Sequence, residues 1–157
     1  MRAVIQRVEK ASISINNALP KSMGRGLVVL FGVSKQDTDG CSESLIKKLA
    51  SKTANLRIFA DAEGKMNRSA SDLGLSIMVV SQFTLFSDTR KGNRPSFAEA
   101  ADAPFAKEVY NRYVEELRSN KWREFLTGEF GAMMTVEIVN DGPVTIIIDT
   151  DEWTREK

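Results

Sequence analysis

Short stretches of alternating apolar and polar residues open the chain. Residues 3–8 and 11–15 are rich in β-branched side chains and alternate in part, which is typical of half-buried strands. Asn16 and Asn17 follow, and asparagine tolerates the left-handed backbone region that tight turns use. The pattern predicts two short strands followed by a turn.

Two longer runs are almost wholly apolar. Residues 26–33 read GLVVLFGV, and residues 75–85 read LSIMVVSQFTL, which is nearly all apolar until Ser81. A strand that is buried on only one face would alternate, so these runs indicate strands that are buried on both faces. We expect them at the centre of the sheet.

Weaker strand signals lie elsewhere. They cover residues 56–59 before a turn at Glu63 and Gly64, residues 132–139, and residues 143–149. The last two are separated by Asn-Asp-Gly at 140–142, a composition that favours a tight turn. These two segments are therefore expected to be separate closing strands.

Helical spacing replaces alternation in two segments. Between residues 42 and 56, apolar residues recur every three or four positions with lysines on the opposite side. Asp102 can cap a second helix whose early turn contains Pro104. The first helix would bury Leu45, Ile46, Leu49 and Thr53, and the second Phe105, Val109, Tyr113 and Leu117.

These elements predict one α+β domain over residues 1–157. Strands outnumber helices, and no repeat or low-complexity linker divides the chain. We expect mostly antiparallel strands in a barrel-like pair of sheets, with the two main helices packed on one side.

Composition limits where in the cell the protein is expected and which partners it is expected to bind. Hydrophobic residues make up 42% and charged residues 27%, which is ordinary for a soluble domain. With a formal charge of +1, any RNA contact must come from a local patch. The N-terminus lacks the apolar segment of a signal peptide, and no apolar run approaches the roughly 20 residues of a membrane span. We expect a cytoplasmic protein without a membrane partner.

The absence of histidine and the presence of only one cysteine limit the chemistry. The chain has no histidine, which excludes a Ser-His-Asp or Cys-His arrangement and a His-ligated zinc or iron site. It has one cysteine, Cys41, so neither an intramolecular disulfide nor a CxxC pair can form. We expect no metal and no cofactor. A hydrolase with this sequence would use carboxylates, hydroxyls, backbone dipoles or the substrate itself.

The polar segment Ser81-Gln82-Phe83-Thr84 ends the second apolar run. Its side chains could merely satisfy backbone groups at a strand end. They could also be held by that strand in a cleft, because rigid elements position sites well. The spacing alone leaves both interpretations open.

Gly142-Pro143 is the second unusual segment. Pro143 could simply begin a strand, where proline is tolerated. A Gly-Pro bond is also a candidate for the uncommon cis isomer, which would turn two successive carbonyl oxygens to one side as a small acceptor pair.

Together these segments resemble the D-aminoacyl-tRNA deacylase family over almost the full chain. SQFT and NDGPVT, about 60 residues apart, are specific in combination. Departures lie mainly at 16–23 and 121–129. The matching stretches are MRAVIQRV at the start, NLRIF at 55–59, GKMN at 64–67, VVSQFTL at 79–85, DTRKGNRPSF at 88–97 and VNDGPVT at 139–145.

The resemblance implies hydrolysis of the ester between a D-amino acid and the 3′-terminal adenosine of tRNA. It also implies a homodimer in which Gly142 and Pro143 of one subunit enter the site of the other. Arg7 would hold that loop in place by hydrogen-bonding it across the dimer. Their carbonyls would accept the substrate's α-ammonium, and an L side chain would then collide with the backbone. Glycine has no Cβ, so glycyl-tRNA would also be cleaved.

The resemblance further implies a water nucleophile assisted by the substrate's 2′-hydroxyl. The catalytic segment would be Ser81 to Thr84, with the Phe83 N–H as oxyanion donor and Ser81 and Gln82 shaping the pocket. Thr145 lacks an evident activating base, so we assign it an orienting role.

Two further sets of residues would bind the nucleic acid. Phe83 and Met134 are candidates for the walls of an adenine slot, although Met134 could equally belong to the core. Arg90, Lys91 and Arg94 would meet tRNA phosphates, unless they form an ordinary solvated loop.

Three rival interpretations remain. A related deacylase with a differently oriented Gly-Pro loop would prefer other mischarged substrates. A non-catalytic dimeric nucleic-acid-binding module fits the near-neutral charge poorly. A structural homodimer without a ligand leaves the two motif segments unexplained.

Overall fold

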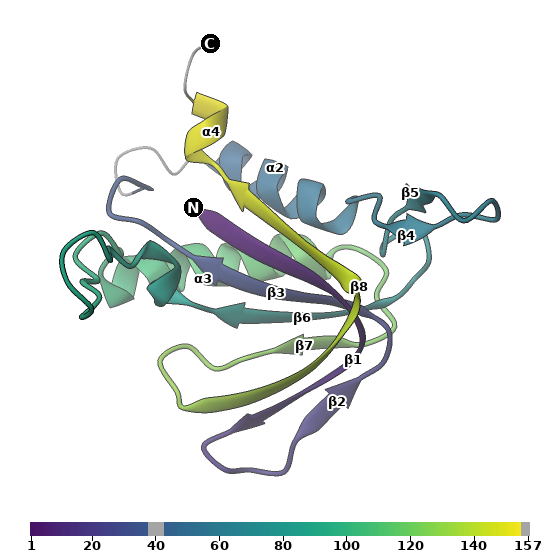
Figure 1. Cartoon of the computed structure of the whole chain (residues 1–157), viewed down its shortest axis with the longest axis horizontal. Coiled ribbons are helices and arrows are strands. Elements are labelled where there is room, and N and C mark those ends of the chain that lie inside the picture. The colour runs from purple at the N-terminus through teal and green to yellow at the C-terminus, as the bar shows by residue number, and fades with distance from the viewer. Residues whose placement is uncertain (38–42, 155–157) are drawn as a thin grey trace.

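A strongly curved six-stranded sheet forms the centre of the computed structural model, which describes residues 1–37 and 43–154 (Figure 1). The long strand β1 organises this sheet: β8 pairs along one edge of it, and β3 and β2 share the other. The strands are β1 (Arg2–Ile15), β2 (Lys21–Met23), β3 (Gly26–Gly32), β4 (Phe59–Ala60), β5 (Met66–Arg68), β6 (Ser76–Ser81), β7 (Phe125–Thr127) and β8 (Met134–Asp149). The helices are α2 (Glu43–Ala54), the 3₁₀ helix η1 (Phe83–Phe86), α3 (Ala103–Arg118) and α4 (Asp151–Thr154).

The sheet is mixed. β1 pairs antiparallel with β2, β3 and β8, whereas β3–β6 and β6–β7 are parallel. The sheet curls toward a barrel, and α2 and α3 lie on one side of it (Figure 1). The predicted α+β class, with a barrel-like sheet and two main helices on one side, is confirmed.

The two apolar runs are buried on both faces because the sheet separates two cores. In β3, Leu27 and Phe31 point to the core under the helices, whereas Val28 points into the curl of the sheet. Ile77 and Met78 of β6 divide in the same way. Alternate side chains of one strand therefore fill different cores.

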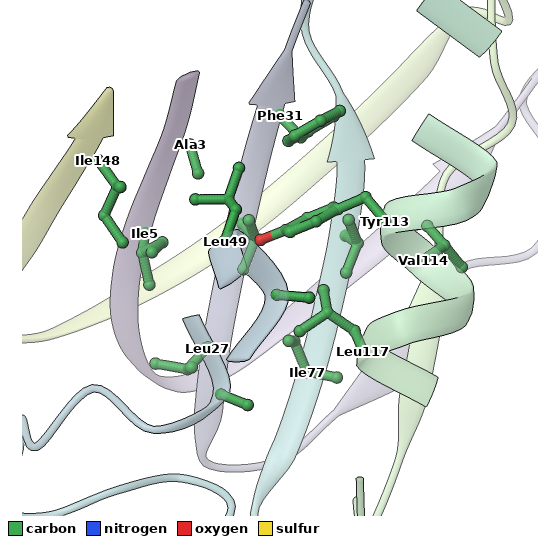
Figure 2. Close-up of a cluster of buried hydrophobic side chains, with 14 of the residues drawn as sticks. Ala3, Ile5, Leu27, Phe31, Leu49, Ile77, Tyr113, Val114, Leu117 and Ile148 are labelled. Atoms are coloured by element: carbon green, nitrogen blue, oxygen red, sulfur yellow. The ribbon is translucent and has the colours of Figure 1, made fainter. Parts of the chain in front are cut away.

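Tyr113 of α3 lies at the centre of the larger core (Figure 2). Its ring stacks on Phe31 with centroids 4.3 Å apart and an interplanar angle of 10°, and its hydroxyl lies 2.7 Å from that of Thr53 in α2. Burial raises the pKa of Tyr113. Leu49 and Leu117 point to the same core from the two helices (Figure 2).

The helix predictions are confirmed over most of their length. α2 runs from Glu43, and the predicted first position, Ser42, lies outside the described residues. The cap prediction is wrong in detail: Asp102 takes the N-cap position of α3, but its side chain makes no capping bond. Of the predicted core positions, Ile46, Leu49, Thr53, Val109, Tyr113 and Leu117 are buried, and Leu45 and Phe105 are half-buried.

The two strands predicted at the N-terminus form one strand, β1. Register shifts on either side of Val8 let it bend without ending. Ala3 and Ile5 therefore face the helices, whereas Ala11 and Ile13 face the second core. The turn predicted after β1 is confirmed, since Asn16 and Asn17 have φ values of 50° and 61°.

The turn predicted at 140–142 is wrong. β8 continues through these residues and stays paired with β1. Between the pairs Val8↔Asn140 and Gln6↔Thr145, β1 has only Arg7, whereas β8 has residues 141–144. The surplus residues form an irregular bulge, because pairing with β1 on both sides prevents the chain from reversing.

Two other strand predictions need correction. The strand predicted over 75–85 ends at Ser81, and the chain continues as η1. In the segment 56–59 only Phe59 becomes a strand residue, where β4 pairs with β5 across a turn that contains Gly64 at φ 79°. In both cases the strand covers only the residues that find a pairing partner: Phe59 pairs with Arg68, and Ser81 is the last residue of β6 that pairs with β3.

Candidate active site

A cleft of about 390 Å³ opens where β6 ends, which is within the range of small-molecule sites. Ser81, Gln82, Phe83 and Met134, all predicted from the sequence, line it together. The opposite wall comes from the segment that leads into β8. The remaining lining residues are Val80, Phe130, Gly131, Ala132, Met133 and Val136.

A close approach of β3 holds the polar segment in place. The Gln82 N–H donates to the Phe31 carbonyl at 2.7 Å. A Cβ on Gly32 would lie 2.9 Å from the Gln82 carbonyl oxygen, so only glycine permits this packing. The Gln82 amide donates to the Thr84 hydroxyl. Thr84, which was also predicted as a site residue, is not among the residues that line the cleft.

Phe83 presents both an aromatic face and a backbone donor. It begins η1, so its N–H has no acceptor within that helix, and Gln82 makes no side-chain cap. Its side chain is 55% exposed and meets Phe97 edge-on, with ring centroids 5.1 Å apart. An exposed ring beside an N–H donor can stack on a base and hydrogen-bond an oxyanion.

An Arg–Asp pair that sequence reasoning missed holds the end of η1. Arg2 donates through Nη2 to Asp149 at 2.7 Å and through Nη1 to the Leu85 carbonyl at 2.6 Å. Its guanidinium carbon lies 4.8 Å from the centre of the Phe86 ring. We call this arrangement the Arg2 pair; it fixes η1 to the strands β1 and β8.

The Gly142-Pro143 segment lies away from this cleft. Its peptide bond is cis, with Gly142 at φ 119°, and both residues are exposed. Thr145 is exposed and lies opposite Gln6 on β1. Where Thr145 pairs with Gln6, β1 and β3 lie between β8 and β6. Met134 and Val136 at the start of β8 line the cleft, but Gly142, Pro143 and Thr145 are not among its lining residues. One chain therefore does not bring Gly142, Pro143 or Thr145 to Ser81.

Arg7 contacts the Gly142-Pro143 segment of its own chain. Its Nε lies 2.9 Å from Asp141 Oδ2, in an ion pair that lacks the alignment of a hydrogen bond. Its Nη1 donates to the Ile58 carbonyl at 2.6 Å. We call this arrangement the Arg7 pair; it joins the bulge of β8 to the residue that precedes β4.

The basic loop after η1 contains three cationic side chains, of which only Arg90 forms an ion pair with the described residues. Arg90 binds both carboxylate oxygens of Asp88, at 2.8 and 2.7 Å, which lowers the pKa of Asp88 to about 2. Lys91 and Arg94 are exposed, and neither makes a hydrogen bond or ion pair with the described residues. Asp88 pairs with Ser96 at the base of the loop.

Within residues 1–37 and 43–154, no group of three or more His, Cys, Asp or Glu side chains lies close enough together to hold a metal ion. No helix of that part of the chain is long and apolar enough to cross a membrane. Cys41 lies outside the described residues.

Comparison with known proteins decides the family. A family model described as D-Tyr-tRNA(Tyr) deacylase matches residues 4–149. The chain belongs to this deacylase family. It is thus a hydrolase, which confirms the prediction of an enzyme and the resemblance on which that prediction rested.

Curated relatives of the deacylase family match along almost their whole length. A D-aminoacyl-tRNA deacylase from Dictyoglomus turgidum is 50% identical over 100% of this chain and 97% of its own. One from Dehalococcoides mccartyi is 51% identical over 96% of this chain and 95% of its own.

Solved structures agree on the fold. A structure described as c-Myc DNA Unwinding Element Binding Protein superposes with a TM-score of 0.85 at 39% identity, covering 95% of this chain and 98% of its own. A probable eukaryotic D-amino acid tRNA deacylase has a TM-score of 0.79 at 18% identity, covering 94% of this chain and 97% of its own.

Sequence reasoning missed several residues around the cleft and the bulge. Phe97 lies within a stretch that matches the family but carries no chemical signal of its own. The wall at 130–133 belongs to a loop without a recognisable pattern. Arg2, Asp141 and Asp149 are ordinary surface-type charges in the sequence, and only the β1–β8 pairing brings them into pairs.

Proposed function

We propose that this protein hydrolyses the ester bond of D-aminoacyl-tRNA and releases the free D-amino acid and tRNA. Support comes from the two deacylases that are about half identical to the whole chain. The observation that carries the proposal is the cleft that Phe83 and Met134 line together, because Phe83 has an exposed ring and a backbone N–H with no acceptor within η1. An apolar slot next to a backbone donor suits a terminal adenosine that carries an ester.

The proposed chemistry uses water as the nucleophile. Its oxygen attacks the ester carbonyl carbon, and the bond from that carbon to the ribose oxygen breaks. The Phe83 N–H stabilises the oxyanion, a contribution of about 3 kcal/mol for one donor. The 2′-hydroxyl of the substrate assists proton transfer, while Ser81 and Gln82 shape the pocket. Thr145, exposed on β8, has an orienting role.

Discrimination between D and L esters is assigned to a homodimer. The carbonyls of Gly142 and Pro143 from one subunit would accept the α-ammonium of a substrate bound in the cleft of its partner. Support comes from the exposure of both residues and their distance from the cleft in their own chain. With the nitrogen fixed, an L side chain meets backbone, whereas a D side chain and the hydrogen of glycine do not.

The basic loop would bind phosphates of the acceptor stem. Lys91 and Arg94 are exposed on the loop whose last turn leads to Phe97, and Phe97 contacts Phe83. Arg90 is held by Asp88 and would contribute less. A tRNA substrate further implies a role in translation quality control in the cytoplasm.

The test compares release of D-tyrosine and L-tyrosine from matched tyrosyl-tRNAs with EDTA present throughout, and glycyl-tRNA is included as a third substrate. We expect rapid loss of the D ester, measurable loss of glycyl-tRNA and survival of the L ester. If folded dimer cleaves none of them, the deacylase proposal fails. The alternative is then a non-catalytic nucleic-acid-binding module; the description of the 39%-identical structure names a protein that binds a DNA element.

A further inference from the structure

Asp141 has no role in the function proposed above. We propose that Asp141 is a positioning residue, which acts through Arg7 to fix the Gly142-Pro143 segment against the start of the β4–β5 hairpin and so sets the discrimination between D and L esters. The part that concerns discrimination rests on the proposed function. The part that concerns anchoring does not.

The Asp141 carboxylate lies between two guanidinium groups. Its Oδ2 is 2.9 Å from Arg7 Nε and 3.8 Å from Arg25 Nη2. The side chains of Arg7 and Asp141 are 11% and 20% exposed, so solvent screens their attraction much less than it screens a surface pair. Removing the carboxylate would leave a largely buried cation without its counter-charge, a costly arrangement.

Arg7 passes this attachment on to a second element. Its Nη1 donates to the carbonyl of Ile58, the residue before β4. Phe59 is fully buried, and both guanidinium groups face its ring, with the Arg7 and Arg25 carbons 6.0 and 5.4 Å from its centre. Cations over an aromatic ring are attracted to it. The bulge of β8 is therefore tied to the main core through Arg7.

The same arginine packs directly on the proposed gate. A Cβ built on Gly142 would lie 2.8 Å from Arg7 Nη2, so the guanidinium occupies the space where a side chain would stand. A shift of Arg7 would free that space and let the Gly142 backbone move. Because the D–L choice depends on where two carbonyls lie, a movement of about 1 Å is enough to weaken it.

The experiment replaces Asp141 in the full-length dimer by Asn, Ala and Glu and measures kcat/KM for D- and L-tyrosyl-tRNA. We expect Asp141→Ala to lower the D:L ratio on the order of tenfold to a hundredfold, through slower D cleavage and faster L cleavage. Asp141→Asn keeps the shape and should lie between Ala and wild type. Asp141→Glu restores the charge and should recover part of the ratio.

Asp149→Asn is the matched control, because it removes the carboxylate of the Arg2 pair on the same two strands. It should slow both esters in proportion and leave the D:L ratio unchanged. Glu108→Gln, which breaks an exposed pair with Arg112 on α3, should change neither rate. If Asp141→Ala also lowers both rates in proportion, its role is structural only and the specificity proposal is wrong.

A second readout does not depend on catalysis. Hydrogen exchange of a peptide that covers residues 139–146 should be faster in Asp141→Ala than in wild type and unchanged in Asp149→Asn. Equal exchange in Asp141→Ala and wild type would overturn the anchoring. If wild type cleaves neither ester, the proposed function fails together with the specificity role of Asp141, while the exchange rates still decide whether Asp141 anchors the bulge.

Discussion

The Arg2 pair lies at one end of the β1–β8 strand pair and the Arg7 pair near its middle, and the two have the same construction. In each, an arginine of β1 meets an aspartate of β8, donates through Nη1 to a backbone carbonyl at 2.6 Å, and lies near a phenylalanine ring. They differ in setting. Arg2 lies opposite Asp149 in regular register, whereas Arg7 lies opposite the bulge of β8.

The difference in setting corresponds to a difference in what each pair holds. The Arg2 pair attaches η1, which carries Phe83 of the cleft, and the Arg7 pair attaches the exposed Gly142-Pro143 segment. The Arg2 side chain is 34% exposed and that of Arg7 is 11% exposed. In our proposal, one strand pair thus supports the rate of cleavage at its end and the choice between D and L esters near its middle.

Gly142→Ala should have the largest effect, because it disturbs the segment that the Arg7 pair holds. The added Cβ would lie 2.8 Å from Arg7 Nη2 and 2.9 Å from Val144 Cγ2, at a φ of 119° that side chains rarely adopt. We expect a loss of about 1–3 kcal/mol in the free energy of unfolding and a fall in D-ester cleavage on the order of a hundredfold. Denaturant unfolding and ester kinetics measure the two effects.

Gly64→Ala provides the matched control for this substitution. Gly64 has a φ of 79° but no atom within 4 Å of its Cβ position, so it tests backbone strain without a clash. It should cost stability and leave kcat/KM unchanged. Equal activity losses in the two variants would mean that strain alone explains the effect at Gly142.

Arg2→Met tests the contribution of the Arg2 pair. Methionine keeps an apolar side chain beside Phe86 but loses the bonds to Asp149 and to the Leu85 carbonyl. With η1 released, the Phe83 N–H is aimed less well, and kcat/KM for the D ester should fall on the order of tenfold. The D:L ratio should stay at the wild-type value. A lower ratio would mean that the Arg2 pair and the Arg7 pair do not act independently.

The smallest effect concerns the loop next to the Arg2 end. Replacing Lys91 and Arg94 together by Ala should raise KM for tRNA several-fold and reduce the salt slope of binding by roughly one per lost phosphate contact. Arg90→Ala should change less, because Asp88 already holds that guanidinium. Binding measured between low and high salt separates the variants, and an unchanged slope in the double variant would show that the loop does not meet RNA.

Local patterns predicted the elements whose residues decide their own structure. The run at 26–33 and the periodicity of α2 and α3 correspond to observed elements because burial of their side chains follows directly from spacing. The Asn-Asp-Gly prediction failed because pairing with β1, far away in sequence, overrides the local turn preference. The hydrophobic pattern predicts two strands in place of β1, because a register shift such as the one at Val8 leaves no signal in that pattern.

The site was predictable only in part, for the same reason. Ser81, Gln82, Phe83 and Met134 were named from the sequence, and they meet in one cleft. Asp141 and Asp149 were not predicted, because the role of a carboxylate on a strand can be inferred only when its cross-strand arginine is known. The positions of Gly142 and Pro143 relative to a cleft depend on a partner subunit, which no pattern within one chain describes.

The placement of Gly142 and Pro143 inside a strand, and not at a loop tip, also limits how the chain length can change. Val144 and Ile148 are buried, whereas Ile147 is 65% exposed. One inserted residue after Pro143 would turn each following side chain to the opposite face. Val144 and Ile148 would then be exposed, and polar neighbours on the strand would be buried. Homologous chains can therefore exchange residue types along this strand, but insertions and deletions belong in loops such as 87–96.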